Sequence, residues 1–223
     1  MIKMVSFAKR KQGMGVDAFQ DYWLSAHAAR VKNYPGLRRY AVSLTLKGGY
    51  RVGEPAYDGV AELWFDDLDG FEATRQSPEF AAGVEDLGNF IDLNSRGMIL
   101  VDEHIIKEGP MPAEGVKNIE FVTQKAGMPR DAFRRYWREV HGPLAAKISV
   151  IQRYVQSHTR DELYQNGGLP VYDGVAITWF NGVEDMRTSA TLPEYTATRE
   201  DEANFLGPEE LPFIITREHV IIS

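Results

Sequence analysis

Histidine and tryptophan side chains recur at matched spacing in the two halves of the 223-residue sequence. His27 and His141 each follow a tryptophan, Trp23 or Trp137, by four residues. An imidazole titrates near neutral pH, so it can give or take a proton at working pH. Because residues four apart share a helix face, each pair offers an aromatic wall beside an acid or base. Both histidines are therefore candidate catalytic residues; a purely structural hydrogen bond at a helix end is the alternative.

Two tyrosines form the second pair of candidate catalytic residues. Tyr40 and Tyr154 each follow an arginine and come early in an expected strand. A phenol in a cavity can donate a hydrogen bond to a developing oxyanion or enolate. The alternative is a core tyrosine whose hydroxyl group is satisfied by the protein itself.

Polar residues at expected strand positions extend the candidate site. His158 shares a strand face with Tyr154, whereas the first half of the chain has Leu44 at the matching position. Glu62 and Glu120 fall in strands that we expect to be buried on both faces, and burial raises the pKa of a carboxyl group. An ion pair or a solvated strand end is the alternative. The expected substrate-binding residues are Trp23, Trp137, His158, Glu62 and Glu120.

The sequence contains no recognisable motif for a metal or a nucleotide. There is no cysteine, no His-x-His or His-Glu-x-x-His pattern and no complete glycine motif for phosphate binding. We therefore expect neither a metal nor a cofactor.

Charge and composition exclude several classes of partner. The net charge is −7 at pH 7 and no lysine/arginine cluster occurs, so we expect no nucleic acid and no membrane surface as partner. No apolar run reaches the roughly 20 residues of a membrane span, and the first residues do not resemble a signal peptide. The absence of cysteine suits a reducing cytoplasm, which is the expected location. The charge run at residues 199–202 is predicted to be a solvated helix face.

An internal repeat organises the chain. Residues 17–27 and 131–141 share Asp, Ala, Phe, Tyr, Trp and His at an offset of 114 (131 minus 17). Residues 57–61 and 172–176 share Tyr-Asp-Gly-Val-Ala at an offset of 115 (172 minus 57). Two copies indicate a duplicated domain, since solenoids need more repeats. The prediction is a first unit at 1–107, a Pro/Gly-rich linker at 108–115 and a second unit at 116–223.

Each unit is predicted to have the order β-α-β-β-α-β, which is the ferredoxin-like α+β pattern. Such a unit carries its helices on one face of the sheet and must bury the other face. We expect the two bare faces to pack into a pseudo-two-fold α/β barrel with a ligand cavity between the sheets. One chain then forms a monomeric barrel or exchanges halves in a homodimer. The expected strands are residues 2–8, 38–46, 59–65 and 98–106, then 116–123, 152–160, 174–180 and 213–222; the expected second helical stretches are 68–87 and 183–205.

The repeated motifs resemble the EthD family of the dimeric α/β-barrel superfamily. They are Phe-x-x-Tyr-Trp-x-x-x-His, a later Arg-Tyr, a Tyr-Asp-Gly-Val-Ala strand that ends in Trp-Phe, and a terminal Glu-His strand. The resemblance covers both copies. The second copy, with His-Gly-Pro-Leu at 141–144, is closer to the family pattern than the first. The resemblance implies the barrel fold and, through the wider superfamily, a small-molecule site.

Three functions remain open at this point. The first is a cofactor-independent isomerase, lyase or cyclase that transfers a proton on a small aromatic, lactone or polyketide-like compound. The second is a non-catalytic protein that binds a small hydrophobic or aromatic ligand, as a carrier or accessory protein of a pathway. The third, implied by the resemblance, is a haem-binding, oxygenase-like protein with His141 as the ligand.

Overall fold

The computed structural model describes residues 1–209 and 211–223, which divide into two compact units. The first unit comprises Met1–Asp102 together with Glu218–Ser223, and the second comprises Glu103–Arg217. Strands β4 (Gly97–Lys107) and β8 (Phe213–Ile222) each begin in one unit and end in the other. None of the helices in the described residues has the length and apolar character that a membrane span requires.

The two units contain the same elements in the same order. The first has β1 (Ile2–Ala8), α1 (Val16–Tyr22), η1 (Trp23–His27), α2 (Ala28–Val31), β2 (Leu37–Thr45), η2 (Lys47–Tyr50), β3 (Gly59–Phe65), α3 (Leu68–Arg75), α4 (Pro78–Asp86) and η3 (Leu87–Asn89). The second has β5 (Val116–Val122), α5 (Arg130–Tyr136), η4 (Trp137–His141), α6 (Gly142–Ala145), β6 (Arg153–Thr159), η5 (Asp161–Gly167), β7 (Gly174–Phe180), α7 (Val183–Ser189), α8 (Pro193–Asp201) and η6 (Glu202–Asn204).

Both sheets have the strand order of a ferredoxin-like fold. The hydrogen-bonded order is β4-β1-β3-β2-β8 in the first unit and β8-β5-β7-β6-β4 in the second. The central pairs are antiparallel, with Ile2 opposite Phe65 and Val116 opposite Phe180. The prediction of two ferredoxin-like α+β units is confirmed, and the strands expected at 2–8, 59–65, 174–180 and 213–222 have those bounds.

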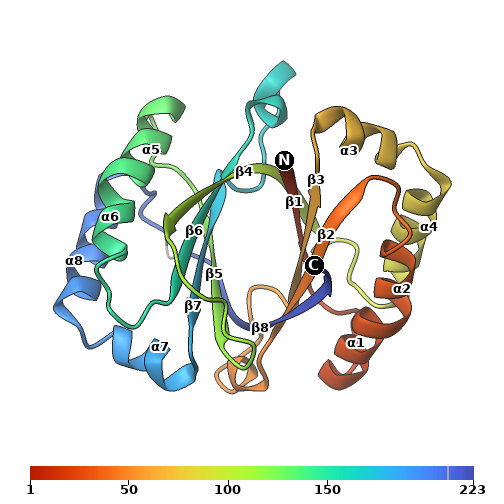
Figure 1. Cartoon of the computed structure of the whole chain (residues 1–223), viewed down its shortest axis with the longest axis horizontal. Helices are drawn as coiled ribbons and strands as arrows, with labels where there is room; N and C mark the ends of the chain where they lie inside the picture. Colours follow the sequence, from red (N-terminus) through yellow and green to blue (C-terminus); the bar gives the residue numbers. More distant parts are fainter. Residues whose placement is uncertain (210) are drawn as a thin grey trace. The chain divides into compact units, whose positions relative to one another are not determined.

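The helices of each unit lie along one face of its sheet (Figure 1). They bury aromatic side chains against that face, chiefly Phe19 and Phe90 in the first unit and Phe133 and Phe205 in the second. The expected stretches 68–87 and 183–205 are each divided into two helices, α3 and α4 or α7 and α8. A proline begins the second helix of each pair, and proline is favoured in the first turn because it lacks the N–H that has no partner there.

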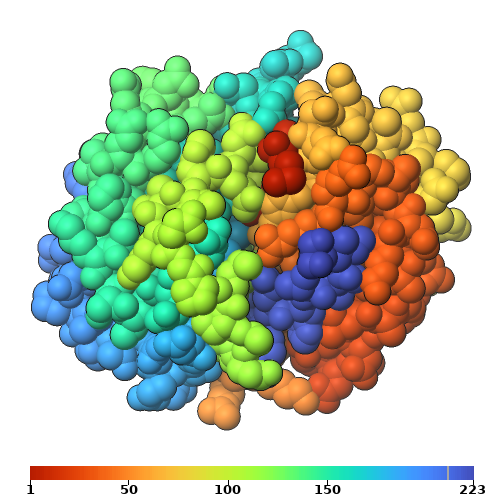
Figure 2. All heavy atoms as spheres, in the orientation of Figure 1, coloured from red at the N-terminus to blue at the C-terminus, as the bar shows by residue number. Residues whose placement is uncertain are grey.

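The last residues of the chain complete the first unit. Residues 218–223 lie at the surface beside strand β2 (Figure 2). The guanidinium of Arg39 on β2 lies 3.8 Å from the carboxylate of Glu218. The fifth strand of the first sheet is therefore supplied by the opposite end of the sequence.

The aspartate of the repeated Asp-Gly motif ties two loops to the sheet. Asp58 accepts hydrogen bonds from the backbone N–H of Arg10, at 2.8 Å, and from its guanidinium, at 2.6 Å. In the second unit Asp173 accepts from the backbone N–H of Gln124 at 2.8 Å. These bonds hold the segment that follows the first strand of each unit against the start of the third strand.

The glycine of the same motif makes room for the tryptophan of the first helix. A Cβ on Gly59 would lie 2.6 Å from the ring of Trp23, and a Cβ on Gly174 would lie 2.7 Å from the ring of Trp137. A side chain at either position would separate the helix from the sheet. The motif therefore sets the depth at which each tryptophan is buried.

Replacing Gly174 with alanine is expected to lower the free energy of unfolding by about 1–3 kcal/mol, the usual cost of overpacking a filled core. The new Cβ would also lie 2.5 Å from the backbone oxygen of Ser157, which cannot move away as a side chain would. Urea denaturation measures the change. Gly182→Ala is the control, because no atom lies within 4 Å of a Cβ there; equal losses in the two variants would contradict this explanation.

Candidate functional site

The helix that carries each Trp-x-x-x-His motif contains a π-helical turn, which a short α-helical segment follows directly. These turns are η1 in the first unit and η4 in the second, and each begins at the tryptophan and ends at the histidine. Single π turns are rare and are frequent at functional sites. The turn places His27 on the ring of Phe90, at 4.8 Å between centroids, and His141 on the ring of Phe205, at 4.7 Å.

Each histidine pairs with an aspartate at the end of an α-helix, Asp86 on α4 or Asp201 on α8; the first pair is buried and the second is partly buried. His141 Nδ1 lies 3.0 Å from Asp201 Oδ2. The other oxygen of Asp201 accepts from the hydroxyl of Tyr136, at 2.7 Å, and from the amide of Asn204, at 3.0 Å. The same arrangement occurs in the first unit, with distances of 2.9, 2.8 and 3.0 Å, among His27, Asp86, Tyr22 and Asn89.

These contacts determine which nitrogen of His141 carries the proton. Burial by itself raises the pKa of Asp201, but hydrogen bonds from Tyr136, Asn204 and His141 outweigh it and lower the pKa below the ordinary value. Burial lowers the pKa of His141, and Asp201 opposes this only in part. A neutral imidazole beside an ionised carboxylate must donate through Nδ1. Nε2 therefore keeps its lone pair and can accept a proton.

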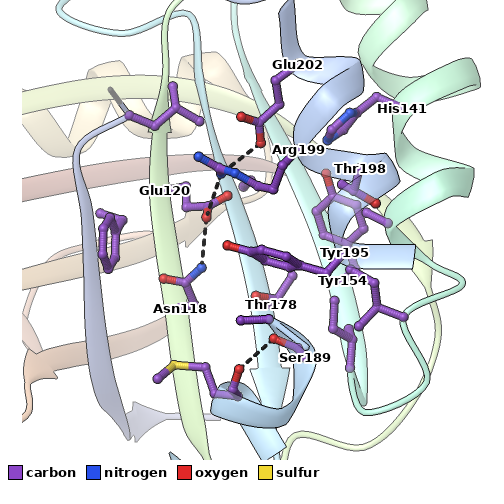
Figure 3. Close-up of a pocket in the computed structure, with 18 of the residues that line it drawn as sticks. Asn118, Glu120, His141, Tyr154, Thr178, Ser189, Tyr195, Thr198, Arg199 and Glu202 are labelled. Carbon is purple, nitrogen blue, oxygen red and sulfur yellow. Dashed lines mark hydrogen bonds and ion pairs between the residues drawn. The ribbon is translucent and has the colours of Figure 1, made fainter. Parts of the chain in front are cut away.

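A pocket of about 430 Å³ lies between the sheet and the helices of the second unit (Figure 3). Apolar side chains form much of its wall, including Ile148, Ile151 and Phe180. Short or polar side chains on the helix-facing side of β5 and β7 leave this space unfilled. The polar residues that line it are Asn118, Glu120, His141, Tyr154, Thr178, Arg187, Ser189, Tyr195, Thr198, Arg199 and Glu202.

One arginine lies between two carboxyl groups in this pocket. The guanidinium of Arg199 is 2.8 Å from Glu202 Oε1 and 3.9 Å from Glu120 Oε1 (Figure 3). Asn118 donates to Glu120 at 3.2 Å. Burial raises the pKa of Glu202 to about 7, although Arg199 opposes the shift, and burial also raises the pKa of Glu120. The pocket thus holds one carboxyl group, that of Glu202, that can be protonated near neutral pH.

Tyr154, Gln156 and His158 form one connected group on β6. The Gln156 amide donates to the hydroxyl of Tyr154 at 3.0 Å, and its oxygen lies 3.1 Å from His158 Nε2. His158 stacks on Trp137, with 4.4 Å between ring centroids. Burial lowers the pKa of His158 to about 2, so this ring is neutral. Tyr154 and Trp137 line the pocket of the second unit, and His158 supports Trp137 from behind.

The first unit has a pocket at the equivalent place, with a volume of about 330 Å³. Trp23, His27 and Tyr40 line it, and Trp23 Nε1 donates to the hydroxyl of Tyr40 at 3.2 Å. The structure therefore brings six of the candidate residues together as two equivalent sets, one in each unit. Glu120 joins only the set of the second unit.

Glu62 is not brought to either of these pockets. It forms a buried ion pair with Lys3, 2.9 Å between Oε2 and Nζ, on the face of the sheet opposite the helices. An ion pair was the alternative interpretation of Glu62 in the sequence analysis. Both pockets lie on the helix-covered face of their sheet, whereas the sequence led us to expect the ligand on the bare face.

The prediction that residues 199–202 form a solvated helix face is wrong for three of the four residues. Asp201 bonds His141, and Arg199 and Glu202 line the pocket. Only Glu200 is exposed. A short charged run does not indicate which of its side chains face the sheet, and here the helix packs with one charged face toward it.

The aspartate partners of the histidines were also missed in the sequence. Asp86 and Asp201 lie about 60 residues from their histidines, as the chain separations of 59 and 60 show. A signal was present, because both aspartates recur at the repeat offset of 115 (201 minus 86), as do Asn89 and Asn204. The recurrence of these polar residues in both copies indicated that the aspartates matter, whereas no local motif could link them to the histidines.

The charges that line the pocket give no argument for or against haem, because Glu120 and Glu202 would repel its two propionate groups and Arg187 and Arg199 would attract them. Among residues 1–209 and 211–223, no cluster of three or more His, Asp or Glu side chains is arranged to hold a metal.

Comparison with known proteins agrees with this architecture. The fold and the paired pockets define a tandem ferredoxin-like α+β protein with a pocket of small-molecule size in each unit. The model of the EthD domain matches residues 11–94 and 125–209. The chain therefore belongs to the EthD family and contains two copies of its domain.

Solved structures share the fold at low sequence identity. An anthrone oxidase-like protein is 9% identical with a TM-score of 0.69, and the match covers 99% of this chain and 92% of that one. A variant of chlorite dismutase from Candidatus Nitrospira defluvii is 10% identical with a TM-score of 0.57, covering 99% and 91%. No protein with a curated description matches the chain.

Replacing Asp201 with asparagine is expected to lower the pKa of His141 further, because the negative charge that opposes the effect of burial is removed. The Asn amide can donate as well as accept, so Nδ1 protonation is no longer enforced. Long-range ¹H–¹⁵N NMR measures both properties. Asp86→Asn is the matched control: it should change His27 and leave His141 as it is, and a change at both histidines in either variant would contradict the assignment.

Glu202→Gln is expected to change the free energy of unfolding, relative to the wild-type protein at the same pH, more favourably at pH 8 than at pH 5. The pKa of Glu202 is raised from 4.5 to about 7, so between these values the folded protein binds more protons than the unfolded chain. The wild-type free energy of unfolding therefore loses this contribution as pH rises, and glutamine does not titrate. Denaturant titrations at the two pH values measure the difference.

The control is Glu200→Gln, which removes the same charge from an exposed neighbour. The difference in free energy of unfolding between Glu200→Gln and the wild-type protein should be the same at pH 5 and at pH 8. An equal gain in both variants would show that net charge, and not the pocket, is responsible.

Proposed function

We propose that the chain is an enzyme that transfers a proton next to a carbonyl group of a small aromatic, lactone or polyketide-like compound, without a cofactor. The observation that carries this is the position of His141: its Nδ1 is held by Asp201, and it lines the 430 Å³ pocket with two carboxyl groups whose pKa values are raised. Isomerisation, cyclisation and elimination all use this step.

His141 is the proposed base. Asp201 fixes the imidazole so that Nε2 has the lone pair, and it stabilises the imidazolium that forms when Nε2 takes a proton. The carbon–hydrogen bond of the substrate breaks, its proton goes to Nε2 and its electron pair moves to the carbonyl oxygen as an enolate.

Glu202 is the proposed acid. A pKa of about 7 keeps part of its population protonated at neutral pH, and a catalytic group is most effective when its pKa is near the working pH. It can return a proton at a second position of the substrate. Arg199, which is bonded to Glu202, moderates the charge that remains afterwards.

Tyr154 is the proposed donor to the enolate oxygen. Burial raises the pKa of its phenol, so the hydroxyl keeps its proton. Its oxygen already accepts from Gln156, which leaves the O–H free to donate. A fixed donor in a site shielded from water stabilises a developing oxyanion.

The pocket wall favours a small ligand with an apolar framework. Its volume lies within the roughly 300–1,000 Å³ range of small-molecule sites. The polar positions of this pocket are apolar or small in the first unit, where Ser6, Val84 and Leu87 stand in place of Glu120, Arg199 and Glu202. The proposed chemistry therefore belongs to the second unit.

The test is hydrogen–deuterium exchange at carbon, followed by NMR in D₂O with 2-tetralone and α-angelica lactone as probes. The wild-type protein is expected to speed exchange of the protons next to the carbonyl. His141→Gln should reduce the catalysed rate by about 10²–10⁴-fold, which is the usual contribution of a general base.

His27→Gln is the matched control. It removes the equivalent contact with Asp86 in the first unit, so both variants should lose a similar free energy of unfolding. His27→Gln should keep the exchange rate. Exchange by His141→Gln at the wild-type rate, or equal losses of rate in both variants, would overturn the proposal.

A further inference from the structure

The pocket of the first unit differs in chemical character from that of the second. Its interior is formed mainly by hydrocarbon side chains, and no aspartate or glutamate of the described residues lines it. The apolar lining residues include Met4, Val31, Leu63, Phe80, Leu87 and Ile91. A cavity of about 330 Å³ with such walls takes up an apolar group of small-molecule size.

Two arginines also line this pocket, and both are exposed to solvent. Arg75 uses Nε to bond Glu72 at 3.1 Å, which leaves its terminal nitrogens available. Arg96 has no hydrogen bond or ion pair with any residue that the structure describes. The equivalent positions in the second pocket are Ala190 and Leu211. Arginine at these two positions is therefore specific to the first unit, whose pocket, unlike the second, has no lining carboxyl group among the described residues.

The apolar cavity and the two arginines beside it suit an amphipathic ligand. Guanidinium groups present planar sets of donors that match a carboxylate, often with two hydrogen bonds. An exposed ion pair alone contributes only about 0.2–1 kcal/mol, so the buried hydrocarbon must supply most of the affinity and the arginines select the head group.

We propose that the pocket of the first unit binds an apolar carboxylic acid, with its hydrocarbon body under the helices and its carboxylate at Arg75 and Arg96. This is a second site, and it does not depend on the chemistry proposed for His141. The repeat places an equivalent cavity in each unit, but different positions carry the charged side chains: Arg75 and Arg96 correspond to Ala190 and Leu211.

The test compares 2-naphthoate with 2-naphthamide, which share one aromatic body but differ in charge. Calorimetric titration of the wild-type protein is expected to show tighter binding of the naphthoate. In the double variant Arg75→Gln/Arg96→Gln, the dissociation constant of the naphthoate should rise about five- to tenfold, and that of the amide should stay unchanged. Arg51→Gln, an exposed arginine of the same unit outside the pocket, is the control and should alter neither.

NMR contacts between ligand and methyl groups identify the site. Contacts with Leu63 and Leu87 support the proposal, whereas contacts with Ile148 and Ile215 place the ligand in the other pocket and overturn it. Equal weakening of both ligands in the double variant, or no saturable binding of the naphthoate, also overturns it. None of these outcomes bears on proton transfer by His141, which is measured separately.

Discussion

In each unit one hydrogen bond, from histidine Nδ1 to an aspartate carboxylate, joins the first helical segment to the α-helix that precedes the last strand, α4 or α8. The histidine ends a π turn, and the aspartate ends α4 or α8. The bond fixes the tautomer of the ring and holds the two segments of the helical layer over the pocket. Since it is present in both units, it belongs to the architecture. The chemistry of each pocket is then decided by what else lines it.

Duplication makes this division visible within one chain. Both pockets keep the tryptophan, the histidine and the tyrosine on the same framework. Glu120, Arg199 and Glu202 occur only in the second, and Arg75 and Arg96 only in the first. A single-copy protein must satisfy both stability and specificity with one set of residues. Here one framework carries two different sets of lining residues. Each pocket can therefore be compared with the other to separate residues needed for the fold from residues that select a ligand.

Much of the architecture could be predicted because it depends on local pattern and on the repeat. Strand bounds such as Ile2–Ala8 follow from short apolar runs, and the Trp-x-x-x-His spacing indicated which side chains would meet. Other features depend on contacts between distant residues and could not be read locally. The π turns give no periodic signal. The Asp201 carboxylate looked solvated because its histidine partner is 60 residues away, and the ion pair of Glu62 depends on strand pairing.

Strand β8 ends in the first unit, so the sheet that begins at Ile2 is completed by residues 218–223. On the ribosome, the first unit therefore lacks its fifth strand until residues 218–223 have been translated. The complete sheet of the first unit therefore cannot form before the second unit has been made, in contrast to the usual order in which an N-terminal domain folds first. Until residues 218–223 have left the ribosome, β2 presents an unpaired edge, and an unpaired edge is the part of a nascent sheet that most readily recruits another chain.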